Sequence, residues 1–117
     1  MSFTPEIYEF SIAGYDYVVE FNREALKEAD SMGAITDEGM GAFKRTCVIL
    51  YAGLKKHHPN ITYNRVTKIV DAAIDEGYGL DGFSDIVDDF TRCYKAVFTP
   101  STDNLTLVKK RGVEKKK

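Results

Sequence analysis

Apolar and polar residues alternate from Ile7 to Phe21, which is the period of a half-buried β-strand. The alternation is interrupted only at Ala13-Gly14, where glycine allows the positive φ that a tight turn requires. The pattern therefore predicts a β-hairpin over residues 7–21. The face expected to lie on the rest of the protein carries Tyr8, Phe10, Ile12, Tyr15, Tyr17, Val19 and Phe21. The opposite face, with Glu9, Ser11, Asp16, Val18 and Glu20, is expected to be wet or available to a partner.

From residue 23 to residue 98 the apolar residues recur every three or four positions, which is the period of an α-helix. We expect four mostly short helices, at about 23–32, 37–57, 63–76 and 82–98. An isolated hairpin is marginally stable, so its aromatic face should pack on these helices. The predicted fold class is α+β: an N-terminal hairpin on a bundle of four helices.

Capping residues mark the predicted helix ends. Asn22, Thr36 and Thr62 can accept hydrogen bonds from the first free backbone N–H groups of the three helices that follow them. Gly33 stands where a helix commonly ends in a left-handed residue, and Gly77 and Gly79 are expected to break the helix that precedes them.

The longest apolar helical run lies in residues 42–62, AFKRTCVILYAGLKKHHPNIT. Its predicted helix should end before Pro59, because the residue that precedes a proline avoids helical angles. Gly53, inside this helix, is expected to mark a point of close packing. The other elements are expected to cover this segment.

The length is that of one domain, which we place at residues 1–98, followed by a flexible basic tail at 99–117. Residues 1–98 carry 10 basic and 16 acidic side chains, whereas the tail carries 6 basic and 2 acidic ones. An acidic body repels phosphates, which argues against nucleic acid as a partner. The chain contains no apolar run long enough for a membrane span and no signal peptide at its start, so we expect no membrane association.

Several residues offer reactive groups, but their spacing does not assemble a site. His57 and His58 are adjacent and point to different sides of a helix, so a solvated final turn is favoured over a metal site. Cys47 and His57 are separated by about 15 Å of helix, too far for a nucleophile and its base. Cys47 and Cys93 lie on apolar helix faces, as expected for reduced, buried thiols.

The acidic residues between Asp71 and Asp89 lack the ligand spacing of a calcium loop, so a solvated face is favoured over a metal-dependent hydrolase or a docking surface. The glycine-rich GYGLDG (77–82) follows a helix rather than a strand, which is unlike a nucleotide-binding loop. We therefore expect no enzymatic activity, no cofactor and no metal.

Four segments in order, YDYVVEFN (15–22), FNREALKEADSMG (21–33), YAGLKKHHPNIT (51–62) and VTKIVDAAIDEG (66–77), resemble the tail assembly chaperones of long-tailed phages and prophages of Gram-positive bacteria. The resemblance covers about Ile7 to Phe98. The sequence departs from the family's pattern at two places. One is Ala13-Gly14, where the family would lead us to expect a more polar turn, and the other is the glycine-rich DEGMGAF (37–43).

The resemblance implies a non-catalytic factor of viral morphogenesis that acts in the host bacterial cytoplasm and is absent from the mature virion. Such proteins bind the tape measure protein and recruit tail tube subunits to it. The family also implies a longer form made by ribosomal frameshifting, for which the terminal lysine run is a candidate slip site. The alternative is a small helical adaptor or a structural tail or virion protein.

A chaperone surface should expose aliphatic and aromatic side chains to its client. The residues around the His-His-Pro turn are the candidates for partner binding, although core packing is an alternative role for each. Open hairpin edges also make a homo-oligomer plausible. The candidate residues are Tyr51, Leu54, Ile61 and Tyr63.

Overall fold

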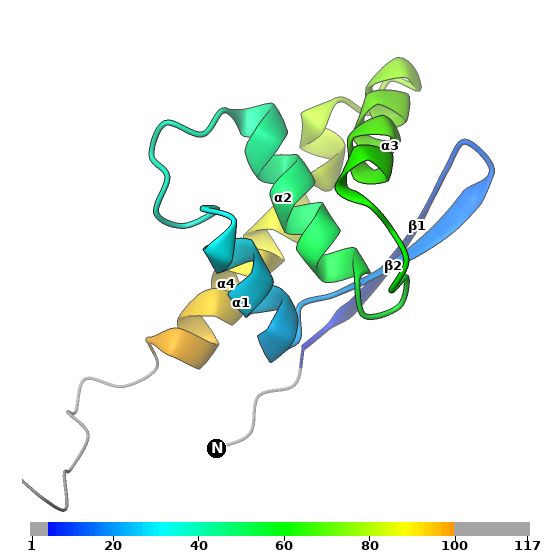
Figure 1. Ribbon diagram of the computed structural model, residues 1–117. Helices are drawn as coiled ribbons and strands as arrows, with labels where there is room; N and C mark the ends of the chain where they lie inside the picture. Colours follow the sequence, from blue (N-terminus) through cyan, green and yellow to red (C-terminus); the bar gives the residue numbers. More distant parts are fainter. Residues whose placement is uncertain (1–4, 100–117) are drawn as a thin grey trace, which may run out of the picture.

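The computed structural model describes residues 5–99 and shows the predicted α+β architecture. Strands β1 (Ile7–Ile12) and β2 (Tyr15–Glu20) form an antiparallel hairpin. The helices α1 (Arg23–Ser31), α2 (Ala42–Leu54), α3 (Tyr63–Asp75) and α4 (Ser84–Phe98) follow, with a short 3-10 helix, η1 (Leu80–Phe83), before α4. Figure 1 shows α2 in the middle, with the hairpin, α1 and α3 around it and α4 behind it. The predicted tail and residues 1–4 lie outside the described residues.

The hairpin turns through Ala13 and Gly14, which both have positive φ, 54° and 83°. This is the two-residue turn whose twist matches that of the strands. The register pairs Tyr8 with Val19, Phe10 with Tyr17 and Ile12 with Tyr15, as the alternation predicts.

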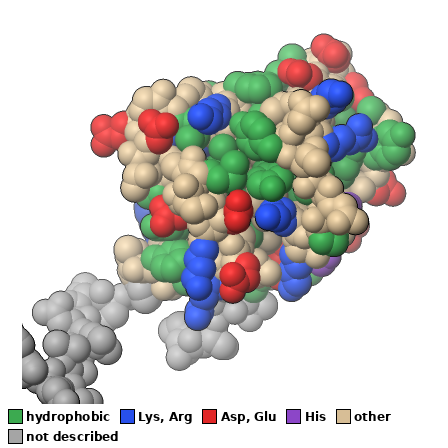
Figure 2. Space-filling view, in the orientation of Figure 1, with side chains coloured by type: hydrophobic (Ala, Val, Ile, Leu, Met, Phe, Trp, Pro, Cys, Tyr) green, Lys and Arg blue, Asp and Glu red, His purple; other side chains and the backbone are tan. Residues whose placement is uncertain are grey.

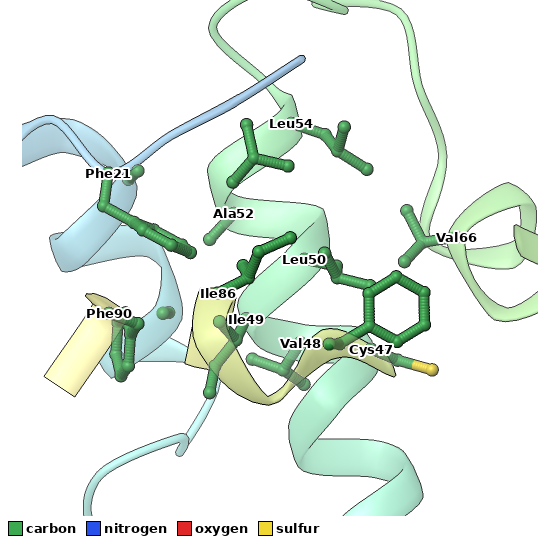
Figure 3. Close-up of a cluster of buried hydrophobic side chains, with 14 of the residues drawn as sticks. Phe21, Cys47, Val48, Ile49, Leu50, Ala52, Leu54, Val66, Ile86 and Phe90 are labelled. Carbon is green, nitrogen blue, oxygen red and sulfur yellow. The ribbon is translucent and has the colours of Figure 1, made fainter. Parts of the chain in front are cut away.

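The core is centred on α2, which is buried on nearly all sides from Thr46 to Leu54. Figure 3 shows Phe21 and Phe90 beside one end of this core and Val66 facing α2 from the other side. Gly53 is the close-packing point that the sequence predicts. A Cβ at this position would lie 2.7 Å from Phe21 Cε1 and 2.7 Å from Val19 Cγ1, so α2 can approach β2 only with glycine here.

The predictions for helix ends are confirmed at four places. The side chains of Asn22 and Thr62 accept hydrogen bonds from the backbone N–H of Ala25 (2.8 Å) and of Arg65 (3.1 Å). Gly33 has φ 93°, and the N–H of Ala34 beyond it donates to the carbonyl of Ala29, which closes α1 in a Schellman motif. Gly77 ends α3 in the same way, with Tyr78 N–H bonded to Ala73.

The predicted start of the central helix is wrong. Thr36 does not cap it; α2 begins at Ala42, after Gly41 in extended backbone. Residues 32–41 instead form a loop that is held by Arg45. Its guanidinium donates to the carbonyl oxygens of Asp37 (2.8 Å), Ala34 (3.2 Å) and Met40 (3.2 Å). One side chain therefore binds three carbonyls of the loop, and only that of Asp37 also accepts a backbone hydrogen bond, from the Met40 N–H at 3.2 Å.

Candidate partner-binding groove

The four predicted partner-binding residues do not share one environment. Leu54 is fully buried in the core, so a partner of the folded protein cannot reach it. Tyr51, Ile61 and Tyr63 are half-buried at the margin of the core. The rings of Tyr51 and Tyr63 meet edge to face at 5.9 Å, and Lys55 Nζ lies 5.2 Å from the centre of the Tyr51 ring. Figure 2 shows one face of the molecule, on which hydrophobic side chains gather near the centre among charged ones.

A buried carboxylate lies beside the residues that follow α2. Glu20 was expected on the solvated face of the hairpin, but it is only 6% exposed. Its two oxygens accept hydrogen bonds from Lys56 Nζ at 2.8 Å and from His57 Nε2 at 2.9 Å. Hydrogen bonding to Lys56 lowers the pKa of Glu20, against the opposing effect of burial. The carboxylate therefore remains ionised at neutral pH and fixes the end of α2 to β2.

His58 contacts the same strand in a different way. The backbone N–H of Val18 donates to His58 Nε2 at 3.0 Å, so this ring nitrogen carries no hydrogen. Lys56 and His57 are exposed, as the predicted solvated turn implies, but both histidine rings also bind β2, which the sequence did not indicate. His57 binds the Glu20 side chain, and His58 accepts a hydrogen bond from the Val18 N–H, which would otherwise have no acceptor on this strand edge.

The same contacts shape an open groove between β2 and the α2–α3 turn. We call it the turn groove; its volume is about 390 Å³, and it is lined by residues 15–17, 58–61 and Arg65. Arg65 donates to the hydroxyl of Tyr17 at 3.0 Å, and its guanidinium lies 5.1 Å from the centre of the Tyr15 ring. Tyr15, which was expected to face the core, is 59% exposed. The groove therefore presents an aromatic ring and a cation that packs against it.

Of the predicted candidates, only Ile61 lines the turn groove. Tyr15 and Arg65 were not among the predicted candidates. The alternation placed Tyr15 on the inward face with its partner Ile12, but only Ile12 is buried in the core, and the Tyr15 ring packs against the Arg65 guanidinium instead. Arg65 follows the cap Thr62 by three residues, a position that gives no sign of the strand it contacts.

The remaining reactive groups have structural environments. Burial raises the pKa of the Cys47 and Cys93 thiols to about 11 in each case, which keeps both protonated at neutral pH. Asp89 was predicted on a solvated acidic face but is only 5% exposed, and it accepts hydrogen bonds from Arg92 at 2.6 and 2.9 Å. Residues 5–99 contain no group of three or more His, Cys, Asp or Glu side chains placed to hold a metal ion.

Within the described part of the chain, none of the helices combines the length and the apolar character that crossing a membrane requires. Comparisons with protein-family models, curated proteins and solved structures found no significant match.

Proposed function

We propose that this protein is a non-catalytic assembly factor that binds other proteins, and specifically a tail assembly chaperone of a long-tailed phage or prophage. In this role it binds the tape measure protein and recruits tail tube subunits during tail morphogenesis, in the host cytoplasm and outside the finished virion. The family assignment rests on the resemblance of the segments between Tyr15 and Gly77. A hairpin followed by short helices is compatible with that resemblance.

The observation that carries the binding role is the turn groove. It exposes Tyr15, Pro59 and Ile61 beside Arg65, and its walls are fixed by Glu20 and His58. A preformed groove binds with a smaller entropic cost than a flexible surface. Exposed aromatic and arginine side chains are the types that contribute most at protein interfaces.

The chemistry of the described residues supports a non-catalytic role. The Cys47 and Cys93 thiols have raised pKa values because they are buried. Its histidines hold β2 through Glu20 and Val18, which leaves neither free as a base in this arrangement. The function proposed for the groove is therefore recognition, without a reacting group.

The test is co-expression of the tape measure protein with this chain, followed by measurement of tape-measure solubility and co-purification. We expect the wild-type chain to keep the client soluble and the pair Tyr15→Ala and Arg65→Glu to lose most of this effect. Phe43→Ala is the matched control, because Phe43 is 38% exposed and does not line the turn groove. Unchanged client solubility with the wild-type chain, together with no co-purification, would reject the chaperone function.

A small adaptor or a structural tail protein is the alternative, and the same preparations separate it from the chaperone. A structural component remains in purified virions in stoichiometric amounts, whereas an assembly chaperone is absent from them. The position of the gene adds a second criterion, because a chaperone gene is expected just upstream of a very long tape-measure gene.

A further inference from the structure

Two cations near the start of α3 lie at the turn groove without a carboxylate partner. Arg65 lines the groove itself. Lys68 lines a smaller pocket, of about 90 Å³, which shares Arg65 and Tyr15 with the groove. Both cationic side chains are exposed, and among residues 5–99 neither forms an ion pair. Their charge is therefore available to an anion from outside the described part of the chain.

Two contacts fix the Arg65 guanidinium in the groove. Its Nη2 donates to the Tyr17 hydroxyl at 3.0 Å, and the group lies 5.1 Å from the centre of the Tyr15 ring. The bond to Tyr17 is the one hydrogen bond that this guanidinium makes among residues 5–99, and it uses one N–H group of the planar fork. Two parallel N–H groups of such a fork can bind both oxygens of a carboxylate. Arg65 is therefore already positioned to bind a carboxylate.

The place of these cations on α3 adds to the positive potential. The N-terminal end of a helix is positive, so an anion there is stabilising and a cation is not. Arg65 lies in the first turn of α3, which contains no acidic residue, whereas Asp71 and Asp75 lie in the C-terminal half of the helix. Glu76, after the helix, accepts a hydrogen bond from the Ala13 N–H in the hairpin turn. The start of α3 therefore favours an anion that its own residues do not supply.

The other titratable groups beside the groove do not supply this anion either. Asp16 lines the groove, but its carboxylate is bound by the Ser11 hydroxyl, and it forms no ion pair among residues 5–99. The Glu20 carboxylate is bound by side chains that follow α2. His58 accepts a hydrogen bond from the Val18 N–H through Nε2 and is neutral in this arrangement. Acidic residues beyond about 8 Å are largely screened at physiological salt, so the negative net charge of the domain does not prevent an anion from binding here.

Apolar residues of the α2–α3 turn continue the line of the two cations. Pro59 and Ile61 line the turn groove, and Arg65 belongs to both the groove and the smaller pocket, so it lies between Ile61 and Lys68. Side chains three residues apart on a helix have Cβ atoms about 5–6 Å apart. Side chains at alternate positions of an extended chain lie on one face, about 6.6 Å apart. One face of an extended segment can therefore contact Ile61, Arg65 and Lys68 in turn.

We propose that the turn groove binds an extended, acidic segment of a partner protein. At alternate positions on one face of that segment, an apolar side chain covers Ile61, an acidic one binds Arg65 and a second acidic one binds Lys68. The two acidic side chains supply the carboxylates that the start of α3 lacks, and the apolar one removes Pro59 and Ile61 from water. This inference rests on the binding role proposed for the groove, and not on the identity of the client.

The test is titration of the isotope-labelled full chain with a defined peptide, followed by NMR at physiological salt. The probe is acetyl-Leu-Ser-Glu-Ser-Glu-Ser-amide, and its matched control has glutamine in place of both glutamates. With the acidic peptide we expect saturable shifts of the Arg65 side-chain N–H and of the Ile61 and Lys68 amides. The glutamine peptide should bind at least about tenfold more weakly, because it lacks the charge-assisted hydrogen bonds.

Variants of the chain locate the binding. Arg65→Gln with Lys68→Gln should weaken binding of the acidic peptide at least about tenfold. Arg65→Lys keeps the charge but not the planar fork, so it should still weaken binding about fivefold. Arg23→Gln with Lys27→Gln removes the same charge from exposed positions of α1 that do not line the groove, and it should change the affinity by less than about twofold. The amide spectrum of each variant without peptide separates loss of binding from loss of the fold.

Three kinds of result would overturn the proposal. One is the absence of saturable binding of the acidic peptide to the wild-type chain. Another is equal binding of the glutamine peptide, or the same loss of affinity in the α1 control as in the α3 variant, since either would mean that the contact is not specific. The third is displacement of the peptide by an equal concentration of inorganic phosphate, which would assign Arg65 to a phosphate group.

The peptide titration and the client assay give separate answers. A wild-type chain that keeps the tape measure protein soluble but does not bind the acidic peptide would retain the proposed function and refute the acidic partner. Peptide binding at Arg65 and Lys68, without client solubility or co-purification, would reject the chaperone function and support recognition of an acidic segment in another protein.

Discussion

The contacts of Glu20 lead to a quantitative prediction for Glu20→Gln. Glutamine keeps the shape and one acceptor oxygen but removes the charge that Lys56 and His57 contact at 2.8 and 2.9 Å. A hydrogen bond to a charged group contributes about 1.5–3 kcal/mol when it is well shielded. The Lys56 side chain is 47% exposed and the His57 side chain is 32% exposed, so solvent weakens both contacts. We expect a total loss of about 2 kcal/mol at pH 7.

The assay is urea unfolding of the wild type and of Glu20→Gln between pH 7 and pH 3. In a domain of this size a loss of about 2 kcal/mol lowers Tm by roughly 10 °C, so thermal unfolding provides a second measurement. The folded-state pKa of Glu20 lies below its ordinary value of 4.5. The carboxylate therefore stabilises the fold above the unfolded-state pKa, and this contribution is lost as pH falls through the folded-state value. The difference between wild type and variant should shrink over the same acidic range.

Glu9→Gln provides the matched control for this experiment. Glu9 lies on the same face of the hairpin as Glu20 but is exposed, and among residues 5–99 its side chain has no ion-pair partner. Its substitution should change the free energy of unfolding by less than about 0.5 kcal/mol. If Glu20→Gln behaves like this control, or if its effect is the same at pH 3 and pH 7, the assignment of Glu20 as an ionised tether is incorrect.

Four further predictions concern packing, an edge contact, a loop and the thiols. Gly53→Ala should destabilise the protein by about 1–3 kcal/mol in urea unfolding, because the added Cβ would overpack against Phe21. Gly41→Ala is the control: the space around its Cβ is open, so it should change stability by less than about 0.5 kcal/mol. Similar values for both variants would contradict the close contact at Gly53. His58→Ala should cost about 1–2 kcal/mol and accelerate amide exchange at Val18, and unchanged exchange there would rule out the contact. Arg45→Lys should cost about 1–3 kcal/mol in urea unfolding, since an ammonium cannot reproduce three guanidinium contacts, and a neutral result would mean that water replaces them. Both thiols should resist a thiol reagent at pH 8 until the protein unfolds in urea, and rapid labelling of Cys93 in the folded state would contradict its burial.

The elements that sequence reasoning predicts correctly are specified by neighbouring residues. Asn22 and Thr62 cap helices through side chains that reach three residues ahead, and Gly33 ends α1 through its own φ. The hairpin register follows from a two-residue turn and an alternation of period two. Each of these features is specified by residues close together in the sequence, so no knowledge of the tertiary structure is needed.

The incorrect predictions arise where a distant residue changes the local preference. Thr36 is an acceptable cap by itself, but Arg45 draws the preceding carbonyls into a loop and α2 starts at Ala42. Glu20 follows the polar alternation and is nevertheless buried, since a helix end 36 residues later supplies its partners. Asp89 is a different case, because Arg92, which neutralises it, is only three residues away on α4. A single sequence shows which side chains are polar but not which of them will be paired.

The two hairpin edges differ because different helical segments flank them. The turn after α2 carries the two histidines, and it closes the edge of β2 through Val18 and Glu20. Among residues 5–99 no side chain covers the outer edge of β1 in this way, because α3 ends in a Schellman motif at Gly77 and the chain then passes into η1, whose Phe83 packs on the Phe10 ring. The result is one hairpin edge fixed beside the turn groove and one hairpin edge whose outward N–H groups have no acceptor among residues 5–99.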